Sequence, residues 1–233
     1  MNSFIASFEN TIATLTSDES WHCTKVLRNK IGDKIHVIDG KGSHADAIIE
    51  LVSEKKVIAK IISNITKENH RPYQLNIAIA PTKNLDRIEL MVEKMVEIGV
   101  DEISFLLCKN SERKVIKIER IKKIVESAVK QSFQSFIPPV NEITELNAFI
   151  RSNNANQKLI AHCNSDENKI SISSINFKNK KTVILIGPEG DFTAQEISEA
   201  EKNGFKSIDL GSTRLRTETA GIYASIAVSL LQQ

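Results

Sequence analysis

Two glycine-containing segments carry residue types suited to ligand binding, 184–193 (ILIGPEGDFT) and 210–220 (LGSTRLRTETA). In the first segment, Gly187 and Gly190 permit positive φ and let the backbone approach a ligand closely. Pro188 fixes its own φ, so this turn is stiff, and its free amides and carbonyls could hydrogen-bond to an adenine edge. A tight turn leading into a capped helix explains the first segment equally well. Neither the GxGxxG fingerprint nor a phosphate-binding P-loop is present.

The second segment is denser in polar side chains. Arg214 and Arg216 lie beside Thr217 and Glu218 with no aliphatic run to bury them. The planar guanidinium group of arginine suits a phosphate or a base edge. A helix start explains Thr217 as a cap and Glu218 as a complement to the helix dipole, but it leaves both arginines unexplained.

Strands and helices alternate after Pro72, which indicates a mainly parallel sheet covered on both faces. The spacing of Ile88, Met91 and Met95 is typical of an amphipathic helix. Strands are expected over 74–80, 102–108, 158–163, 182–187 and 207–211, and helices over 85–98, 118–132, from a capping box at 193–196, and over 218–231. Ligands in such sheets bind at the carboxyl ends of strands, where both polar segments begin.

The first 65 or so residues are mostly β in character. Short apolar segments recur at 34–39, 45–52 and 56–62, and one short helix is expected over 18–28. This pattern predicts a small β-barrel. The polar segment 67–72 is the candidate linker, so we expect an N-terminal domain over residues 1–70 and a second domain over residues 71–233.

The chain has 233 residues, of which 41% are hydrophobic and 26% charged, with a net charge of +2. This balance is ordinary for a soluble globular protein and excludes a strongly basic nucleic-acid binder. Segment 109–123 has a local excess of lysine and arginine that could hold a phosphate backbone, although a solvated helix face explains it too.

Several classes of protein are disfavoured. No apolar run approaches the roughly 18 residues of a membrane span, and no signal peptide is recognisable. The three widely spaced cysteines fit reduced thiols in a cytoplasmic protein, and no Cys/His cluster has the spacing of a zinc site.

Five segments together carry a family resemblance. Besides the two loops, they are HCTKVLRNKIGDKIHVIDGKG (22–42), PTKNLDRIELMVEKMVEIGV (81–100) and VESAVKQS (125–132). In their order and spacing, the chain resembles the RsmE family of 16S rRNA (uracil-N3)-methyltransferases, within the SPOUT superfamily.

The resemblance implies an α/β fold, with a small N-terminal PUA-like β-barrel and a C-terminal SPOUT domain containing a deep trefoil knot. It implies S-adenosylmethionine-dependent methylation of uridine N3 in 16S rRNA of the small ribosomal subunit, by a cytoplasmic homodimer without a metal. A SPOUT enzyme acting on another RNA site and a non-catalytic RNA-binding ribosome-assembly factor are the alternatives.

The resemblance also implies roles for particular residues. The expected catalytic residues are Arg216, Arg214 and Glu218, where the arginines would stabilise a uridine anion and either Glu218 or water would take the N3 proton. The expected cofactor residues are Leu185, Ile186, Gly187, Glu189, Gly190, Leu210, Gly211, Leu215 and Thr219. The expected RNA contacts are Arg28, Lys83, Arg87 and Arg113.

The chain departs from the family pattern in three places. Asp191 replaces the usual second glycine of a GPEGG loop, and Ser212-Thr213 replaces a common Pro-Arg. Phe133-Gln134 replaces a common Gly-Arg, which removes the basis for an RNA contact from that segment. His162 ends an expected strand and could reach the site, although a satisfied core or edge histidine is the simpler interpretation.

Overall fold

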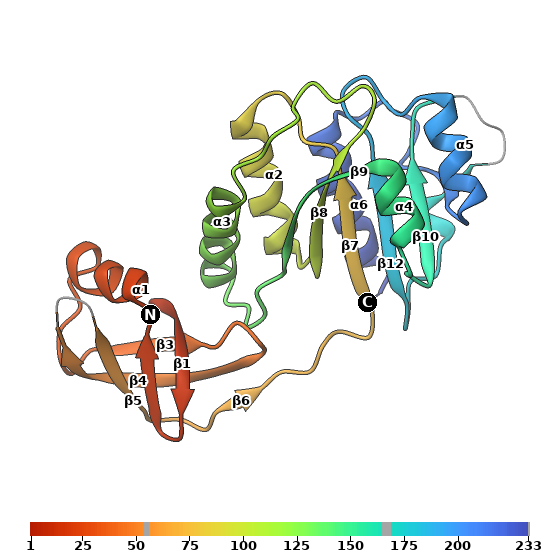
Figure 1. Ribbon diagram of the computed structural model, residues 1–233. Coiled ribbons are helices and arrows are strands. Elements are labelled where there is room, and N and C mark those ends of the chain that lie inside the picture. Colours follow the sequence, from red (N-terminus) through yellow and green to blue (C-terminus); the bar gives the residue numbers. More distant parts are fainter. Residues whose placement is uncertain (54–55, 165–168, 233) are drawn as a thin grey trace. The chain divides into compact units, whose positions relative to one another are not determined.

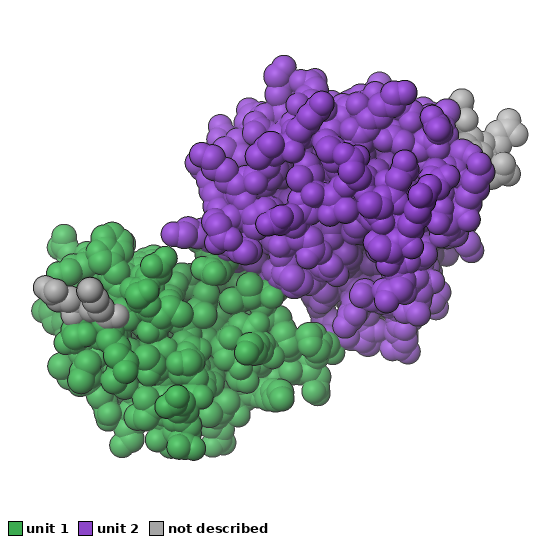
Figure 2. All heavy atoms as spheres, in the orientation of Figure 1, with its two compact units in different colours: residues 1–70, 126–137 green, residues 71–125, 138–233 purple. Residues whose placement is uncertain are grey.

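The computed structural model describes residues 1–53, 56–164 and 169–232, and it divides into two compact units (Figure 2). Unit 1 contains residues 1–70 together with 126–137, and unit 2 contains residues 71–125 and 138–233. The sequence predicted a division at residue 70 alone. In the structure, residues 126–137 also belong to unit 1. The sequence gives no signal for a boundary at residue 126, because one helical pattern runs through it.

Unit 1 is built on a closed barrel of five strands. These are β1 (Ser3–Glu9), β2 (Ile12–Leu15), β3 (Lys34–Ile38), β4 (Ser43–Val52) and β5 (Val57–Ile61), with the short β6 (Thr66–Lys67) on the edge of β4. Their order is β3-β1-β2-β5-β4, and pairing of β3 with β4 closes the barrel. Alternate residues such as Ile35 and Val37 fill the interior, so His36 between them points outward. The helix expected over 18–28 is a short α1 (Ser17–Trp21) followed by one π-helical turn, η1 (His22–Val26).

Unit 2 contains a seven-stranded sheet in which every recorded pairing is parallel (Figure 1). Its order is β11-β13-β10-β12-β7-β8-β9. The strands are β7 (Gln74–Ile79), β8 (Glu102–Leu107), β9 (Val140–Glu145), β10 (Gln157–Ala161), β11 (Ile170–Ser171), β12 (Lys181–Ile186) and β13 (Lys206–Asp209). The central β7 and β12 are buried almost throughout, as expected for strands covered on both faces.

Helices cover both faces of this sheet (Figure 1). They are α2 (Leu85–Ile98), α4 (Leu146–Ser152), α5 (Ala194–Lys202) and α6 (Thr217–Leu230), with a short 3-10 turn, η2 (Ile172–Ser174). A further helix, α3 (Ile118–Gln131), begins among the residues of unit 2 and ends among those of unit 1. The expected capping box at the start of α5 is confirmed, because Thr193 and Glu196 bond each other's backbone N–H groups. No helix in the described parts of the chain is long and apolar enough to cross a membrane.

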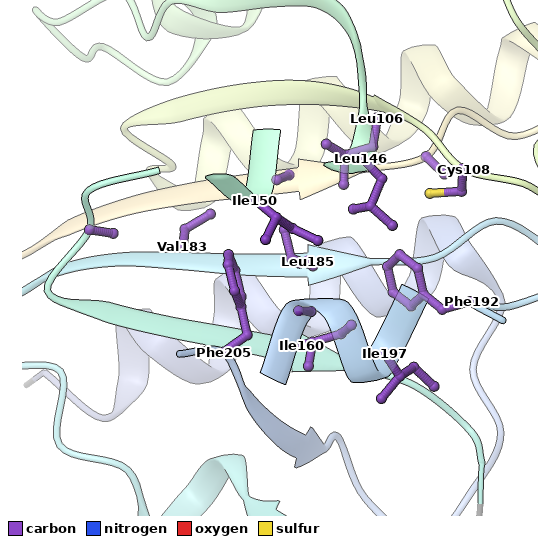
Figure 3. Close-up of a cluster of buried hydrophobic side chains, with 14 residues drawn as sticks. Leu106, Cys108, Leu146, Ile150, Ile160, Val183, Leu185, Phe192, Ile197 and Phe205 are labelled. Atoms are coloured by element: carbon purple, nitrogen blue, oxygen red, sulfur yellow. The ribbon is translucent and has the colours of Figure 1, made fainter. Parts of the chain in front are cut away.

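The two faces are packed by alternate residues of the same strands. On one face, α4 and α5 place Ile150 and Ile197 in a cluster with Leu185 of β12 (Figure 3). On the other face, α6 brings Gly221 so close to Ile79 of β7 that an added Cβ would lie 3.0 Å from its Cδ1. Phe192 joins the first cluster, so the loop after β12 is anchored in the core. The sheet is therefore a rigid base for the loops at its strand ends.

Candidate active site

A cavity of about 830 Å³ lies in unit 2 at the carboxyl ends of three neighbouring strands, β10, β12 and β13. Parallel pairing places Ala161 beside both Ile186 and Ile208 at the ends of these strands. The loops that follow therefore begin at the same edge of the sheet. Most of the cavity wall comes from these loops, namely 161–163, 186–189, Asp191 and 208–217, and Arg87, Lys169 and Ala220 complete it.

The loop after β12 is compact, but its glycines act differently from the expectation. Gly187 and Gly190 do not adopt positive φ, and the left-handed residue is Asp191, with φ of 61°. An added Cβ on Gly187 would lie 3.1 Å from the Phe192 ring, so this glycine serves close packing. Asp191 tolerates its conformation because its Oδ1 accepts the Phe192 N–H at 2.7 Å.

Asp191 also connects two of the loops around the cavity. Its Oδ2 accepts the Cys163 N–H at 2.7 Å, which ties the loop after β10 to the loop after β12. From the other side, the Asn110 amide donates to the carbonyl oxygens of Gly190 at 3.1 Å and Asp191 at 3.0 Å. The sequence had marked Asp191 only as a departure from the family pattern, and it contained no signal for Asn110.

The loop after β13 is attached to the same turn through Thr217. The buried Thr217 hydroxyl donates to the Gly187 carbonyl at 3.0 Å. The expectation that Thr217 caps its helix is wrong, since Arg216 occupies the N-cap position of α6 and its side chain makes no capping bond. The threonine hydroxyl instead satisfies a buried carbonyl of the other loop.

Three arginines are among the described residues that line the cavity, namely Arg87, Arg214 and Arg216. Nη1 of Arg87 lies 3.5 Å from Oε1 of Glu218, whose side chain is only 12% exposed. The second carboxylate oxygen of Glu218 is buried, with no hydrogen-bond partner among the described residues. Glu218 is not part of the cavity wall and lies behind Arg87, which the sequence had assigned to RNA rather than to this cavity.

Six of the nine expected cofactor residues line the cavity: Ile186, Gly187, Glu189, Leu210, Gly211 and Leu215. The other three do not. Leu185 is buried in the cluster beneath α4 and α5, Gly190 packs against Asn110, and Thr219 is exposed on α6.

Two of the expected RNA residues gather near the loop after β12. The Lys83 ammonium lies 3.0 Å from a Glu112 carboxylate oxygen, and the Lys83 N–H donates to Glu189 at 3.0 Å. Arg113 donates to the carbonyls of Thr82 and Lys83. Arg28 is exposed in unit 1, with φ of 57°.

His162 lines the cavity, and its ring is held by a chain of hydrogen bonds. The Ser207 hydroxyl donates to Glu201 at 2.8 Å, so it must accept from His162 Nε2, 3.0 Å away. The residue as a whole is 9% exposed. This arrangement fits the edge-histidine interpretation and fixes the orientation of the ring. Among the described residues, no group of His, Cys, Asp and Glu could hold a metal ion.

Two family models match the chain. One is described as an RNA methyltransferase domain and covers residues 69–229, and the other is an RNA methyltransferase PUA domain and covers residues 15–62. Ribosomal RNA small subunit methyltransferase E of Rickettsia conorii is 30% identical over 225 residues, which cover 96% of this chain and 91% of that relative. The protein of the same name from Mesomycoplasma hyopneumoniae is 38% identical over 174 residues, or 71% and 73% of the two chains.

Solved structures are similar over the whole chain. A probable rRNA-methyltransferase from Porphyromonas gingivalis has a TM-score of 0.89 and 37% identity, and the similarity covers 100% of this chain and 98% of that one. Ribosomal RNA small subunit methyltransferase E from Neisseria gonorrhoeae, bound to S-adenosyl methionine, has a TM-score of 0.88 and 27% identity over 99% and 98% of the chains. These similarities confirm the predicted PUA-like barrel and SPOUT-type sheet domain.

Proposed function

The chain belongs to the RsmE family of ribosomal RNA small subunit methyltransferases, and we propose that it methylates N3 of a uridine in 16S rRNA with S-adenosylmethionine as methyl donor. One observation carries this proposal. A cavity at three parallel strand ends is lined by glycine-containing loops and by three arginines, Arg87, Arg214 and Arg216. This arrangement combines a site for a nucleoside cofactor with positive charge for an anionic base.

The residues present fit the cofactor. The cavity has the size of a typical small-molecule site. Gly211, at φ of 118°, has open space where a Cβ would lie, so the backbone of the loop after β13 is exposed to a ligand. Ile186, Gly187, Leu210 and Leu215 would hold the adenosine part by backbone hydrogen bonds and apolar contact. When bound, S-adenosylmethionine supplies a methyl group activated by its sulfonium.

The chain's own part in catalysis is to position the base and stabilise its charge. Uridine N3 must lose a proton before it is a good nucleophile. Arg214 and Arg216 stabilise the resulting anion in the cavity. Glu218 holds the Arg87 guanidinium in place, and water accepts the N3 proton, because Glu218 lies outside the cavity wall. Rigid loops then keep the base aligned for transfer.

The proposal includes the RNA contacts and the oligomeric state of the protein. Lys83, Arg113 and Arg28 would contact the phosphate backbone of 16S rRNA in the small ribosomal subunit. The protein would act in the cytoplasm as a homodimer. Tyr223, Ile226 and Leu230 support the dimer, because they form an exposed apolar stripe on α6 with 40–61% exposure.

The test is methyl transfer from labelled S-adenosylmethionine to small ribosomal subunits that lack the modification, read by nucleoside mass spectrometry. We expect 3-methyluridine with the wild-type chain and at least roughly a hundredfold less with Arg216→Ala, because an anion-stabilising group is lost. Arg151→Ala is the matched control, since Arg151 lies outside the cavity wall and pairs with Glu199 on the surface.

Two outcomes would contradict the proposal in different ways. Cofactor binding without transfer to these subunits would indicate another RNA target. Absence of cofactor binding in calorimetry would favour the non-catalytic ribosome-assembly factor.

A further inference from the structure

Phe133 of unit 1 is an aromatic side chain held at the surface. It lies two residues after Gln131, the last residue of α3, and is 59% exposed. Its backbone is left-handed, with φ of 55°. Left-handed conformations are strained for bulky residues, and such strain is retained mainly where the surroundings or a function require it.

The end of helix α3 explains the conformation but not the phenylalanine. The Gln134 N–H bonds to the Val129 carbonyl at 3.1 Å, and the Phe133 N–H bonds to the Lys130 carbonyl at 3.4 Å. These two bonds form a Schellman motif, in which glycine is the usual left-handed residue. Helix α2 ends in that way, at Gly99 with φ of 106°. The ring at Phe133 is therefore not needed to end its helix.

The ring lies beside the His36 imidazole on the outer face of the barrel, and His36 in turn lies beside the His44 imidazole. Its centroid is 6.3 Å from that of His36 on β3, and the His36 and His44 rings are 5.3 Å apart. Both imidazoles are oriented by carboxylates, His36 by Asp46 at 3.1 Å and His44 by Glu68 at 3.6 Å. Three flat rings are thus fixed next to one another, with the Phe133 ring the most exposed.

The same face of the barrel carries ammonium groups. Lys34 lies two residues before His36 on β3 and therefore on the same face. Strand pairing places Ile48 of β4 between Lys34 and Lys60 of β5. Lys34 pairs with Asp46 at 2.9 Å, and Lys60 has no ion pair among the described residues. Flat rings beside positive charge are the combination that binds unpaired nucleotides, with bases on the rings and phosphates on the lysines.

We propose that Phe133, supported by His36 and His44, is a stacking platform on unit 1 for an unpaired base of the RNA substrate, with Lys60 toward the adjacent phosphate. This proposal rests on the proposed function, since it assumes an RNA substrate. It assigns RNA contact to the segment that follows α3, through stacking on an exposed aromatic ring.

The test uses the full chain and a single-stranded RNA 12-mer carrying one 2-aminopurine, whose fluorescence is quenched by stacking. For Phe133→Gly we expect affinity weakened roughly tenfold and quenching lost. Its melting temperature should be unchanged or higher, because glycine suits the left-handed position. Phe133→Trp should retain both binding and quenching.

Asn10→Gly is the matched backbone control, since Asn10 is also left-handed in unit 1, with φ of 54°. It should leave RNA affinity unchanged. Phe133→Leu keeps an apolar side chain without a ring, and it decides the question should the glycine variant fold poorly.

The outcomes separate this proposal from the proposed function. Wild-type affinity and quenching in Phe133→Gly or Phe133→Leu would overturn the platform, while methyl transfer by the wild-type chain would still support the enzyme. A wild-type chain that binds S-adenosylmethionine but no RNA would overturn both. With the platform correct, the glycine variant raises the KM for RNA and leaves kcat nearly unchanged, because a stacking platform contributes to RNA binding and not to the methyl-transfer step.

Discussion

Thr217 shows how one hydroxyl can join two loops of a cavity. Its bond to the Gly187 carbonyl is buried, so deleting it leaves that carbonyl without a partner. We expect Thr217→Val to lower the free energy of unfolding by about 1–3 kcal/mol and to weaken S-adenosylmethionine binding. Thermal unfolding and titration calorimetry would measure the two effects. Thr217→Ser keeps the hydroxyl and should retain most of the stability and most of the cofactor affinity. A serine variant that loses as much of each as Thr217→Val would contradict this role.

Asp46 makes part of the stability of unit 1 depend on pH. Hydrogen bonds from Lys34 and His36 lower the pKa of this carboxyl below its ordinary value of 3.8. A lowered pKa means that the folded state favours the ionised carboxylate. The stabilisation is therefore present above the unfolded pKa and is lost as the pH falls toward the folded pKa.

We expect Asp46→Asn to be less stable than the wild type near neutral pH, with the difference narrowing below about pH 4. Urea unfolding can be followed through Trp21, the only tryptophan, which lies in the same unit. Glu50→Gln removes an exposed carboxylate from the same strand. Its difference in stability from the wild type should not change as the pH falls below about 4. A constant difference across the pH range would contradict the assignment.

At the scale of elements, the start of α5 supports the loops on both sides of it. Glu196 accepts the Thr193 N–H at 2.8 Å through one carboxylate oxygen and the Lys109 N–H at 2.8 Å through the other. The carboxylate thus both caps its own helix and holds the loop after β8. That loop carries Asn110, which binds the turn at Gly190.

We expect Glu196→Ala to lower the free energy of unfolding by about 1–2 kcal/mol, because two backbone N–H groups lose their acceptor. Circular dichroism during thermal unfolding would measure the loss. Glu196→Gln keeps an acceptor oxygen for only one of the two hydrogen bonds. Its free energy of unfolding should therefore lie between those of the alanine variant and the wild type. Full stability of the alanine variant would show that neither bond contributes.

At the scale of the whole molecule, α6 presents the surface from which we propose the homodimer. Tyr223, Ile226 and Leu230 lie at helical spacing on one side and are exposed, while Ala224 and Val228 on the other side are buried. We expect Ile226→Glu to convert a dimer into a monomer in light scattering, because a buried interface disfavours unpaired charge. Leu51→Glu, at an exposed apolar position of unit 1, is the control. A wild-type monomer at micromolar concentration would contradict the dimer.

Local order in the fold was predictable from the sequence. The 3.6-residue spacing of Ile88, Met91 and Met95 predicted α2 within its observed bounds, and buried runs predicted β7 and β12. The first two strands of the barrel, together with β9 and α4, were not identified individually. β9 is largely polar and α4 has only seven residues, so neither has a strong periodic signal.

The sequence by itself determined the family, the alternation of strands and helices, and the two loops that carry the arginines, because these are local patterns of residue type. Only the tertiary structure decided which side chains meet. The Asp191–Cys163 bond joins residues 28 apart and the Thr217–Gly187 bond joins residues 30 apart, and Arg87 reaches the same cavity from a different helix. Such contacts depend on strand order and on the directions of side chains after packing, and no local pattern encodes either. The trefoil knot implied by the resemblance stays a prediction.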